Sequence, residues 1–257
     1  MIFCNLGSGS KGNCTYLQGE SGAILIDQGF SLKNLTERMQ SANLDPGDVA
    51  AIVISHEHSD HVKGIGVFAR HFHIPVYCTE ITCRAIPADV IKNVRIETFT
   101  VGDILEIGDI KLKTFTTPHD AADPIGFVAE SGNVRIAVLT DLGTVVESVI
   151  QHIYDLDLLF LESNHDMWML MNGPYPLYLK HRIKGRDGHL SNEQSLDLFK
   201  RIKMNGRFRH LILGHLSEIN NDPAKVLELF ENGIVHSDRK ISIEIANQHQ
   251  PGNVHIL

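Results

Sequence analysis

The sequence predicts an α/β fold in which two sheets pack against each other and helices cover their outer faces. Apolar runs of strand length fall into two series, one at the start of the chain and one after residue 110, with helical patterns between them. The run at 50–55 is apolar on both faces, as in a strand buried inside a sheet. No repeat or Pro/Gly/Ser-rich linker divides the 257 residues, so we expect a single domain over 1–257.

The elements are expected in the following order. In the first series, apolar runs predict strands at 2–5, 14–20, 23–29, 50–55 and 74–78. Leu32, Leu35 and Met39 lie at helical spacing and predict a helix over 31–41, and another helix is expected at 62–72. The second series predicts strands at 110–119, 124–131, 134–141, 156–163, 211–215, 241–248 and 253–257. Helices are expected at about 144–152, 166–171, 191–203 and 223–231.

Composition and charge narrow the function classes. The formal net charge is −8, from 23 Lys and Arg against 31 Asp and Glu, which argues against a surface coated in positive charge for nucleic acid but allows a local basic site. No apolar run is long enough to cross a bilayer, and the first residues lack the pattern of a secretory signal. The four cysteines form no C-x-x-C pair and are expected to stay reduced. These features predict a cytoplasmic protein with no membrane partner and leave the oligomeric state open.

A histidine-rich loop follows the buried strand at 50–55. His56 and His58 are two residues apart in an extended segment, so their side chains point the same way. Asp60 and His61 come where a helix begins and therefore point in another direction. The loop thus offers two imidazoles to one metal ion and a carboxylate with an imidazole to a second, a donor set that suits Zn, Mn or Fe. The alternative is a polar loop with solvated histidines, which this spacing after a buried strand disfavours.

Three more polar residues end predicted strands. His119 ends 110–119, Asp141 ends 134–141 and His215 ends 211–215. Taken singly, each could be structural, since a strand-end aspartate is often a turn former or a helix cap. Taken with the loop, they can complete two coordination shells. The sequence therefore predicts two divalent metal ions and seven ligands: His56, His58, Asp60, His61, His119, Asp141 and His215.

The HEHSDH loop, followed by a His, an Asp and a His at strand ends, resembles the metallo-β-lactamase superfamily. The resemblance implies an αββα sandwich, with two mixed sheets packed together and flanked by helices. It implies that Asp141 bridges two metals and that Asp27, at the end of AILID, supports a ligand without binding metal. Flavo-diiron members carry a glutamate where this chain has His58, which disfavours oxygen reduction. One metal would be held by His56, His58 and His119, and the other by Asp60, His61 and His215.

Longer segments narrow the resemblance and together span nearly the whole chain. They are similar to the YycJ/WalJ (also VicX) group: GSGSKGNC, SHEHSDHVKG, PHDAADPIGF, ESNHD, GPYPLYLKHRIKGRDGHLSN and LGHLSEINNDP. That group is regarded as containing phosphodiesterases, and 5′-to-3′ exonuclease activity on DNA has been proposed for it. Its members are also linked with the WalK/WalR cell-wall signalling system. The resemblance thus implies a hydrolase that attacks a phosphodiester with metal-activated water.

His189 is the candidate source of a proton for the departing oxygen, which a two-metal site does not itself supply. Ser191 opens a capping box, so His189 stands just ahead of a helix start. The segment resembles the His-Ser-Thr segment of the ribonuclease Z branch, whose histidine is catalytic. LESN at 161–164 resembles that branch's His-Glu-Ala-Thr segment, from which only Glu162 carries over, as a residue that supports a ligand. We assign Asp60 and His189 to the catalytic machinery; a capping or packing role is the alternative for the histidine.

Other polar residues are candidates for contacts with substrate. The glycine-containing turn between the first two strands can offer backbone N–H groups and a lysine to phosphate, although it does not match the Walker A pattern and a tight hairpin is the alternative. Residues 164–165 follow an apolar strand and either line a cleft or cap the next helix. Trp168 and its methionine neighbours are expected to pack in the core, with a surface for stacking bases as the alternative. The substrate-binding candidates are Ser10, Lys11, Asn13, Asn164, His165 and Ser191.

Two basic clusters, at 180–186 and 200–209, precede and follow His189 along the chain. They favour a track for a phosphate backbone, with solvated helix faces as the alternative. The sequence therefore predicts a metal-dependent phosphodiesterase with a nucleic-acid substrate, acting as an exonuclease. Two other functions stay open: hydrolysis of a small molecule such as a cyclic phosphate, lactone or thioester, and a regulatory metal-binding partner of a signalling system. The native metal and the choice between DNA and RNA also stay open.

Overall fold

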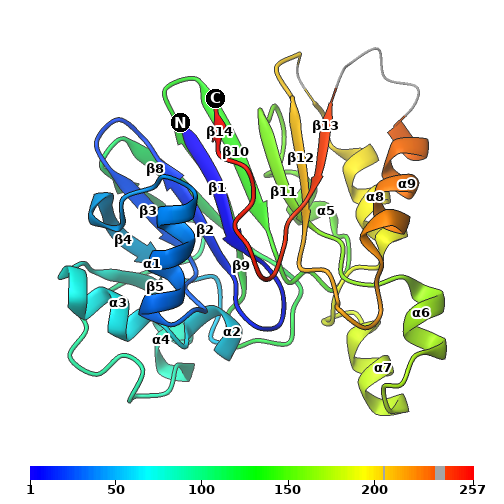
Figure 1. Ribbon diagram of the computed structural model, residues 1–257, viewed down its shortest axis with the longest axis horizontal. Helices are drawn as coiled ribbons and strands as arrows, with labels where there is room; N and C mark the ends of the chain where they lie inside the picture. The colour runs from blue at the N-terminus through cyan, green and yellow to red at the C-terminus, as the bar shows by residue number, and fades with distance from the viewer. Residues whose placement is uncertain (205, 235–240) are drawn as a thin grey trace.

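The structure is a computed structural model that describes residues 1–204, 206–234 and 241–257. Within these residues, the strands form two seven-stranded sheets that pack face to face, with helices on both outer sides (Figure 1). This arrangement confirms the predicted αββα sandwich of two mixed sheets.

The first sheet contains the N-terminal strands and the last strand of the chain. Strands β1 to β3 pair antiparallel, whereas β3 to β6 pair parallel, so this sheet is mixed. In sheet order its strands are β14 (His255–Ile256), β1 (Ile2–Gly7), β2 (Cys14–Gln18), β3 (Ala23–Ile26), β4 (Val49–Val53), β5 (Val76–Thr79) and β6 (Ile96–Phe99).

The second sheet contains the C-terminal half of the chain. Strands β7 to β10 pair antiparallel and β10 to β13 pair parallel. The carboxyl ends of β10, β11 and β12 therefore meet at one edge, where polar residues that follow them come together. In sheet order the strands are β13 (Ser242–Ile245), β12 (His210–Gly214), β11 (Leu158–Glu162), β10 (Val134–Leu139), β9 (Ile125–Ser131), β8 (Ile110–Thr116) and β7 (Ile104–Ile107).

The helices divide between the two outer faces and the lower end of the molecule (Figure 1). The first half of the chain forms α1 (Leu32–Ser41), the 3₁₀ turn η1 (Pro46–Asp48), α2 (Ser59–Val62), α3 (Ile65–Phe72) and α4 (Glu80–Ala85). The second half forms α5 (Glu147–Ile150), α6 (Met167–Asn172), α7 (Leu177–Ile183), α8 (Asn192–Arg201) and α9 (Pro223–Ile234). In Figure 1, α6 and α7 lie beyond the ends of the strands. Among the described residues, no helix combines the length and the apolar character that crossing a membrane requires.

Buried apolar side chains follow this layering. One cluster lies between the two sheets and includes Phe3, Phe127 and Phe160. Two others lie between a sheet and its helices, one around Phe68 and one around Phe230. Strands β4 and β11 are buried along almost their whole length, which explains why their sequences are apolar throughout.

Some elements differ from the sequence predictions. The helix expected at 62–72 is α3 alone, preceded by the separate short helix α2; Gly64 separates them, and a Cβ there would lie 1.8 Å from the backbone oxygen of Phe30. The helix expected at 144–152 is shortened to α5. Strands β6 and β7 and helices α4 and α7 were not predicted. The two strands are exposed or half-buried at the edges of their sheets, and α7 buries no side chain. The sequences of these three elements therefore have no strong periodic pattern of apolar residues.

Candidate metal centre

The structure brings the seven predicted ligands together at one end of the sandwich, the lower end in Figure 1, where α2 lies. Each is carried by a segment that leaves a strand at its carboxyl end. The segment after β4 and the helix α2 carry four of them, and the segments after β8, β10 and β12 carry one each: His56, His58, Asp60, His61, His119, Asp141 and His215.

Three imidazoles converge in the first group. The Nε2 atom of His56 lies 3.1 Å from Nδ1 of His58. The same Nδ1 lies 3.3 Å from Nε2 of His119. Three ring nitrogens directed at one point are the donor set of a trigonal or tetrahedral metal position.

The second group combines a carboxylate with two imidazoles. Oδ2 of Asp60 lies 3.5 Å from Nε2 of His61 and 3.8 Å from Nε2 of His215. Asp141 lies between the two groups, with Oδ2 3.1 Å from His61 Nε2 and Oδ1 3.7 Å from His119 Nε2. A carboxylate in that position can reach a metal in either group.

Two buried polar atoms without hydrogen-bond partners indicate that metal ions fit between these ligands. Oδ2 of Asp141 and Nε2 of His215 are buried and have no hydrogen-bond partner in the structure. Buried polar atoms in native proteins nearly always have a partner, and a bound ion is one such partner. Imidazole and carboxylate donors suit Zn, Mn or Fe, so the residues fit the divalent ions that the sequence predicts.

Asp27 holds one side of the centre, as the resemblance implied. Its Oδ2 accepts a hydrogen bond from Nδ1 of His61 at 2.8 Å. Oδ1 of Asp27 accepts from the backbone N–H of Ser55 at 2.8 Å, and Oδ2 also accepts from the Ser55 hydroxyl at 2.7 Å. The Ser55 hydroxyl lies 2.9 Å from Nδ1 of His56. Hydrogen bonds to the remote nitrogens orient the rings, leaving Nε2 of each histidine directed at the centre.

Glu162 accepts hydrogen bonds from histidines on the other side of the metal centre. Its Oε1 accepts from Nδ1 of His215 at 3.0 Å and from Nδ1 of His189 at 2.7 Å. Its Oε2 accepts from the backbone N–H of Leu142 at 2.7 Å. His189, His215, Glu162 and Asp141 also converge closely enough to hold an ion, but both Nδ1 atoms are engaged by the glutamate. We therefore interpret this group as a hydrogen-bond network rather than as a further metal position.

The backbone at three of these positions is left-handed. The φ angles are 60° at Asp27, 55° at Asp141 and 56° at His215. Asp27 and His215 directly follow a strand and Asp141 is the second residue after one, so the chain turns sharply where the side chain must face the centre. Such conformations in non-glycine residues concentrate at functional sites.

Burial and charge act in opposite directions on the ionisable groups. Burial lowers the pKa of His56 well below its usual value, and the neighbouring His61 adds to the effect. For His61, burial is outweighed by the carboxylates of Asp27 and Asp141, which raise its pKa. For Asp141, burial is outweighed by His215 and His61, which lower its pKa. The Asp141 carboxylate is thus held in the ionised form that binds metal.

His189 lies beside both groups and keeps 20% of its side chain exposed. Its ring centroid is 5.2 Å from that of His119 and 5.1 Å from that of His215. Because Glu162 engages Nδ1, the nitrogen available to a substrate is Nε2. The carbonyl of Gly188, the residue before it, accepts from Nδ1 of His119 at 3.0 Å, which ties this segment to the centre.

Comparison with known proteins identifies the family. The family model described as "Beta-lactamase superfamily domain" matches residues 23–216, which include all seven candidate ligands. The chain belongs to the metallo-β-lactamase superfamily. It is therefore a hydrolase by family, as the sequence predicted.

Individual relatives support the narrower resemblance to the YycJ/WalJ group. The chain is 37% identical to Exodeoxyribonuclease YycJ of Bacillus anthracis over 222 residues, 85% of this chain and 83% of the relative. It is 32% identical to Exodeoxyribonuclease WalJ of Streptococcus pneumoniae serotype 2 (strain D39) over 243 residues, 93% of this chain and 90% of the relative. Among solved structures, the metallo-β-lactamase fold protein YhfI of Bacillus subtilis aligns with a TM-score of 0.73 at 14% identity, covering 98% of each chain.

In this superfamily member, the N-terminal turn supports the metal centre more than it offers a phosphate site. The amide of Asn13 lies 3.1 Å from Asp60 Oδ2 and 2.9 Å from His61 Nε2. Ser10 and Lys11 are exposed, and the lysine pairs with Glu218 at 2.8 Å. Of the three substrate-binding candidates in the turn, Asn13 thus contacts two of the ligands, whereas the other two are exposed on the surface.

The other three substrate-binding candidates are buried behind the centre. His165 is 0% exposed, Ser191 2% and Asn164 6%. The side-chain amide of Asn164 donates to the carbonyl of His215, and the Ser191 hydroxyl caps α8. Asn164 and His165 are thus enclosed and do not line an open cleft, and Asp166 rather than His165 caps the next helix. Ser191 opens the capping box that the sequence predicted.

Sequence reasoning missed several supporting residues. Ser55 joins Asp27 to His56, as described above, and the hydroxyl of Ser8 accepts from the backbone N–H of His215 at 2.9 Å. Single serines in loops carry no distinctive signal. Only the position of Ser55, directly before the histidine-rich loop, could have suggested its role.

The two basic clusters lie at different ends of the molecule, contrary to expectation. Helix α8 runs from the metal end to the opposite end, so the cluster at 200–209 is carried away from His189. There the N–H of Arg209 donates to the carbonyl of Asp157, just before β11, and Arg207 pairs with the same aspartate at 3.2 Å. The cluster at 180–186, on and after α7, stays close: the carbonyl of Ile183 accepts from the N–H of His189.

Trp168 is exposed rather than in the core, which corrects the sequence expectation. Its side chain is 69% exposed, and on the next helix Leu177 and Tyr178 are 62% and 75% exposed. Helix α6 buries only Leu170, so its other apolar residues face outward.

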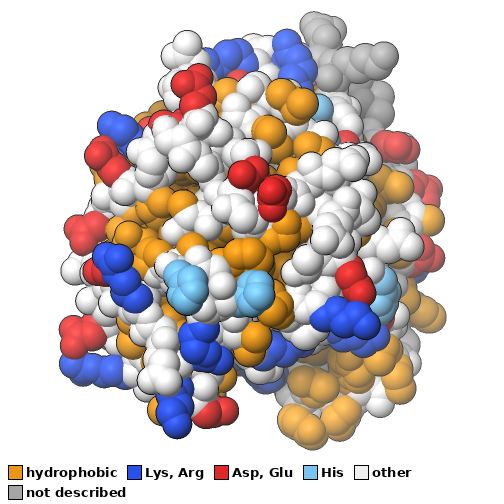
Figure 2. Space-filling view, turned by 60° about the vertical axis from the view of Figure 1, so that its left-hand side comes forward, with side chains coloured by type: hydrophobic (Ala, Val, Ile, Leu, Met, Phe, Trp, Pro, Cys, Tyr) orange, Lys and Arg blue, Asp and Glu red, His pale blue; other side chains and the backbone are white. Residues whose placement is uncertain are grey.

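Figure 2 shows another view of the surface, in which basic and acidic side chains are interspersed and no single charge covers the face.

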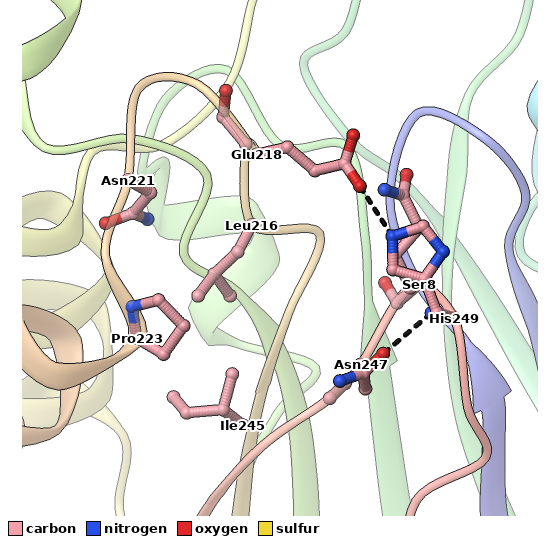
Figure 3. A pocket seen from close by; sticks show the side chains of 11 residues that line it. Ser8, Leu216, Glu218, Asn221, Pro223, Ile245, Asn247 and His249 are labelled. Atoms are coloured by element: carbon pink, nitrogen blue, oxygen red, sulfur yellow. Dashed lines mark hydrogen bonds and ion pairs between the residues drawn. The ribbon is translucent and has the colours of Figure 1, made fainter.

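A cavity of about 490 Å³ lies next to the metal centre. Its wall includes the residues directly after His215 and the segment 245–249 (Figure 3). Glu218 and His249 pair across one side at 2.6 Å. Apolar side chains line another part: Leu216, Pro223 and Ile245.

Proposed function

We propose that this chain is a two-metal phosphodiesterase that degrades DNA from its 5′ end. The observation that carries the proposal is the position of His189, an imidazole beside both ligand groups that is oriented by Glu162 and still partly exposed. Two relatives similar over most of the chain are named exodeoxyribonucleases. We place the activity in the cytoplasm, in keeping with four free cysteines among the described residues.

The seven ligands would hold two ions of Zn, Mn or Fe, which when bound supply activated water and neutralise charge on the phosphodiester. The chain's own residues would do the rest. Asn13 and Asp27 orient Asp60 and His61 from behind. His189 would give the proton on Nε2 to the departing oxygen, and the carboxylate of Glu162 would stabilise its cationic form.

The surface around α7 is the proposed track for the strand. Lys184 and Arg186 follow the helix and lead to His189, while Arg182 pairs with Asp120, next to the ligand His119. The exposed rings of Trp168 and Tyr178 offer faces for stacking bases, a contact that contributes about 1–3 kcal/mol per base in single-strand binding. This combination of local positive charge and aromatic faces suits a single strand despite the acidic total charge.

A circular and a linear single-stranded DNA of one sequence would test the proposal. With Mn, Zn or Fe supplied, we expect the linear strand to lose a 5′ label as a mononucleotide while the circle persists. Equal cleavage of both forms would contradict end dependence. First release of a 3′ label would contradict the direction, and equal degradation of RNA would contradict the DNA preference.

The adjacent cavity favours a second candidate, hydrolysis of a small molecule such as a cyclic phosphate, lactone or thioester. Its volume falls within the range of small-molecule sites, and it borders the segment that carries His215. Turnover of such a compound, with no cleavage of linear DNA under any of the metals, would favour this candidate. A purely regulatory metal-binding role requires that neither substrate class is turned over.

A further inference from the structure

A second cluster of histidine and carboxylate side chains lies at the other end of the sandwich. His210 opens β12, Glu244 lies in β13 and His255 lies in β14. One ligand atom from each lies within 4.8 Å of the others. His210 and His215 are five residues apart along extended chain, so at roughly 3.3 Å per residue the two clusters are about 16 Å apart. We call His210, Glu244 and His255 the distal cluster.

Both histidines of the distal cluster carry a buried nitrogen without a hydrogen-bond partner. His255 is 7% exposed, and its Nε2 makes no hydrogen bond although it lies 3.4 Å from Oε2 of Glu244. Nδ1 of His210 is also buried and unpaired. The two rings are neighbours, with centroids 4.6 Å apart. Two unsatisfied imidazole nitrogens beside one carboxylate are uncommon in a finished protein interior, so something is expected to occupy them.

The carboxylate of the distal cluster is oriented by its own hydrogen bonds. The amide of Asn253 donates to Oε2 of Glu244 at 2.9 Å, and the hydroxyl of Ser242 donates to Oε1 at 3.2 Å. The carboxylate is thus held in place beside the two imidazoles.

A simple ion pair does not account for the arrangement. A protonated His255 next to Glu244 would leave Nδ1 of His210 buried and unpaired. A single cation among the three side chains would satisfy both histidines and the carboxylate at once. Because β14 belongs to the first sheet and β12 and β13 to the second, such an ion would also join the two sheets.

We propose that the distal cluster binds one zinc ion, which links the last strand of the first sheet to the edge of the second. Two imidazoles and a carboxylate are a zinc donor set, with water completing a tetrahedral site. The ion stabilises the packing of β14 and takes no part in hydrolysis at the metal centre.

Zinc stoichiometry of the full chain tests the proposal. After equilibration with micromolar free zinc and removal of excess, we expect His255→Gln to retain one zinc ion fewer than the parent chain. Hydrolysis of a nitrophenyl phosphodiester should change by less than about twofold, because the two clusters are separate. In protein whose metal centre is already loaded, zinc at 100 times the dissociation constant of the distal cluster should raise the melting temperature of the parent by about 5 °C or more, and that further increment should be absent in the variant.

Two further variants keep the test decisive. Glu244→Gln preserves the shape of the side chain and should lose the same ion even if His255→Gln folds poorly. His71→Gln removes an exposed histidine outside both clusters and should retain the full zinc content. Equal zinc content and equal thermal increments in the parent, His255→Gln and Glu244→Gln would overturn the proposal. These readouts do not depend on the substrate of the metal centre, so they stand apart from the proposed nuclease function.

Discussion

Strand β12 has a histidine at each end, and the protein holds the two in different ways. After its carboxyl end, the backbone N–H of His215 donates to Ser8, its Nδ1 donates to Glu162 and its carbonyl accepts from Asn164. At its amino end, Nδ1 of His210 is buried without a partner. Nδ1 of His215 is thus hydrogen-bonded in advance and only its Nε2 stays free for a metal, whereas Nδ1 of His210 has no partner.

This difference in hydrogen bonding indicates different roles for the two ends of β12. Ligands whose remote nitrogen is already hydrogen-bonded keep their orientation before and after a metal binds, as catalysis requires. In the distal cluster the ion itself would complete the positioning, which suits a structural role. Changes at the metal centre should therefore affect hydrolysis, whereas changes in the distal cluster should affect stability alone.

Replacing Asp141 should have the largest effect. Asp141→Asn keeps the size of the side chain and tolerates the left-handed backbone, but it removes the charge that can reach both metals. We expect hydrolysis to fall about 10³-fold or more, since a metal-based contribution of several kcal/mol is lost. Steady-state rates and metal content would measure it. Asp155→Asn, at another left-handed aspartate, is the control, and an equal loss there would point to a backbone effect.

Replacing His189 tests the proton donor. His189→Ala should slow hydrolysis of an ordinary phosphodiester by about 10²–10⁴-fold, the usual range for general acid catalysis, while metal content stays unchanged. A nitrophenyl ester needs less protonation of its leaving group and should lose less. Equal losses on the two substrates would argue for a binding or structural role instead.

Replacing Asp27, which hydrogen-bonds the ligand His61, should lower metal affinity less than replacing a ligand does. Asp27→Asn removes the charge that faces Nδ1 of His61 while keeping a group of similar size. Metal affinity, measured by competition with a chelator, is expected to fall about 10–100-fold. Asp45→Asn, an exposed aspartate at the start of η1, should leave affinity unchanged. Undiminished metal affinity in the Asp27 variant would mean that the hydrogen bond to Asp27 does not position His61 for metal binding.

The basic clusters should give the smallest and most selective effect. Arg182→Ala with Lys184→Ala should weaken binding of a single strand and flatten the log–log salt slope by about 1.4, since each phosphate contact contributes about 0.7. The matched pair Lys200→Ala with Lys203→Ala, at the far end of α8, should leave the slope unchanged. The same flattening in both pairs would show that the strand is not held at α7.

The sequence was informative where its signals were local. The loop from His56 to His61 and the strand-end positions of His119, Asp141 and His215 predicted the residues that meet at the metal centre. Their grouping follows from strand order, which no local pattern contains, and the group assignment came from the family resemblance. The distal cluster went unpredicted because its three residues come from three strands in two sheets, with no spacing that links them.

Burial was the property that the sequence predicted least well. Polar side chains at 164–165 were expected either to line a cleft or to cap the next helix and are enclosed, whereas Trp168 was expected inside and is exposed. In both cases the outcome depends on where α6 and α8 pack, not on residue type. The separation of the two basic clusters has the same cause, since α8 spans the distance between the ends of the sheet.

The left-handed residues Asp27, Asp141 and His215 have a consequence for how such a protein can evolve. Asparagine, aspartate and histidine are the non-glycine residues that this backbone geometry accepts most readily, and two of them are also metal ligands. One position can therefore make the sharp turn and carry the ligand. A drift from aspartate to asparagine would keep the turn while discarding the chemistry. Descendants of this chain could thus become pseudoenzymes without passing through an unfolded intermediate.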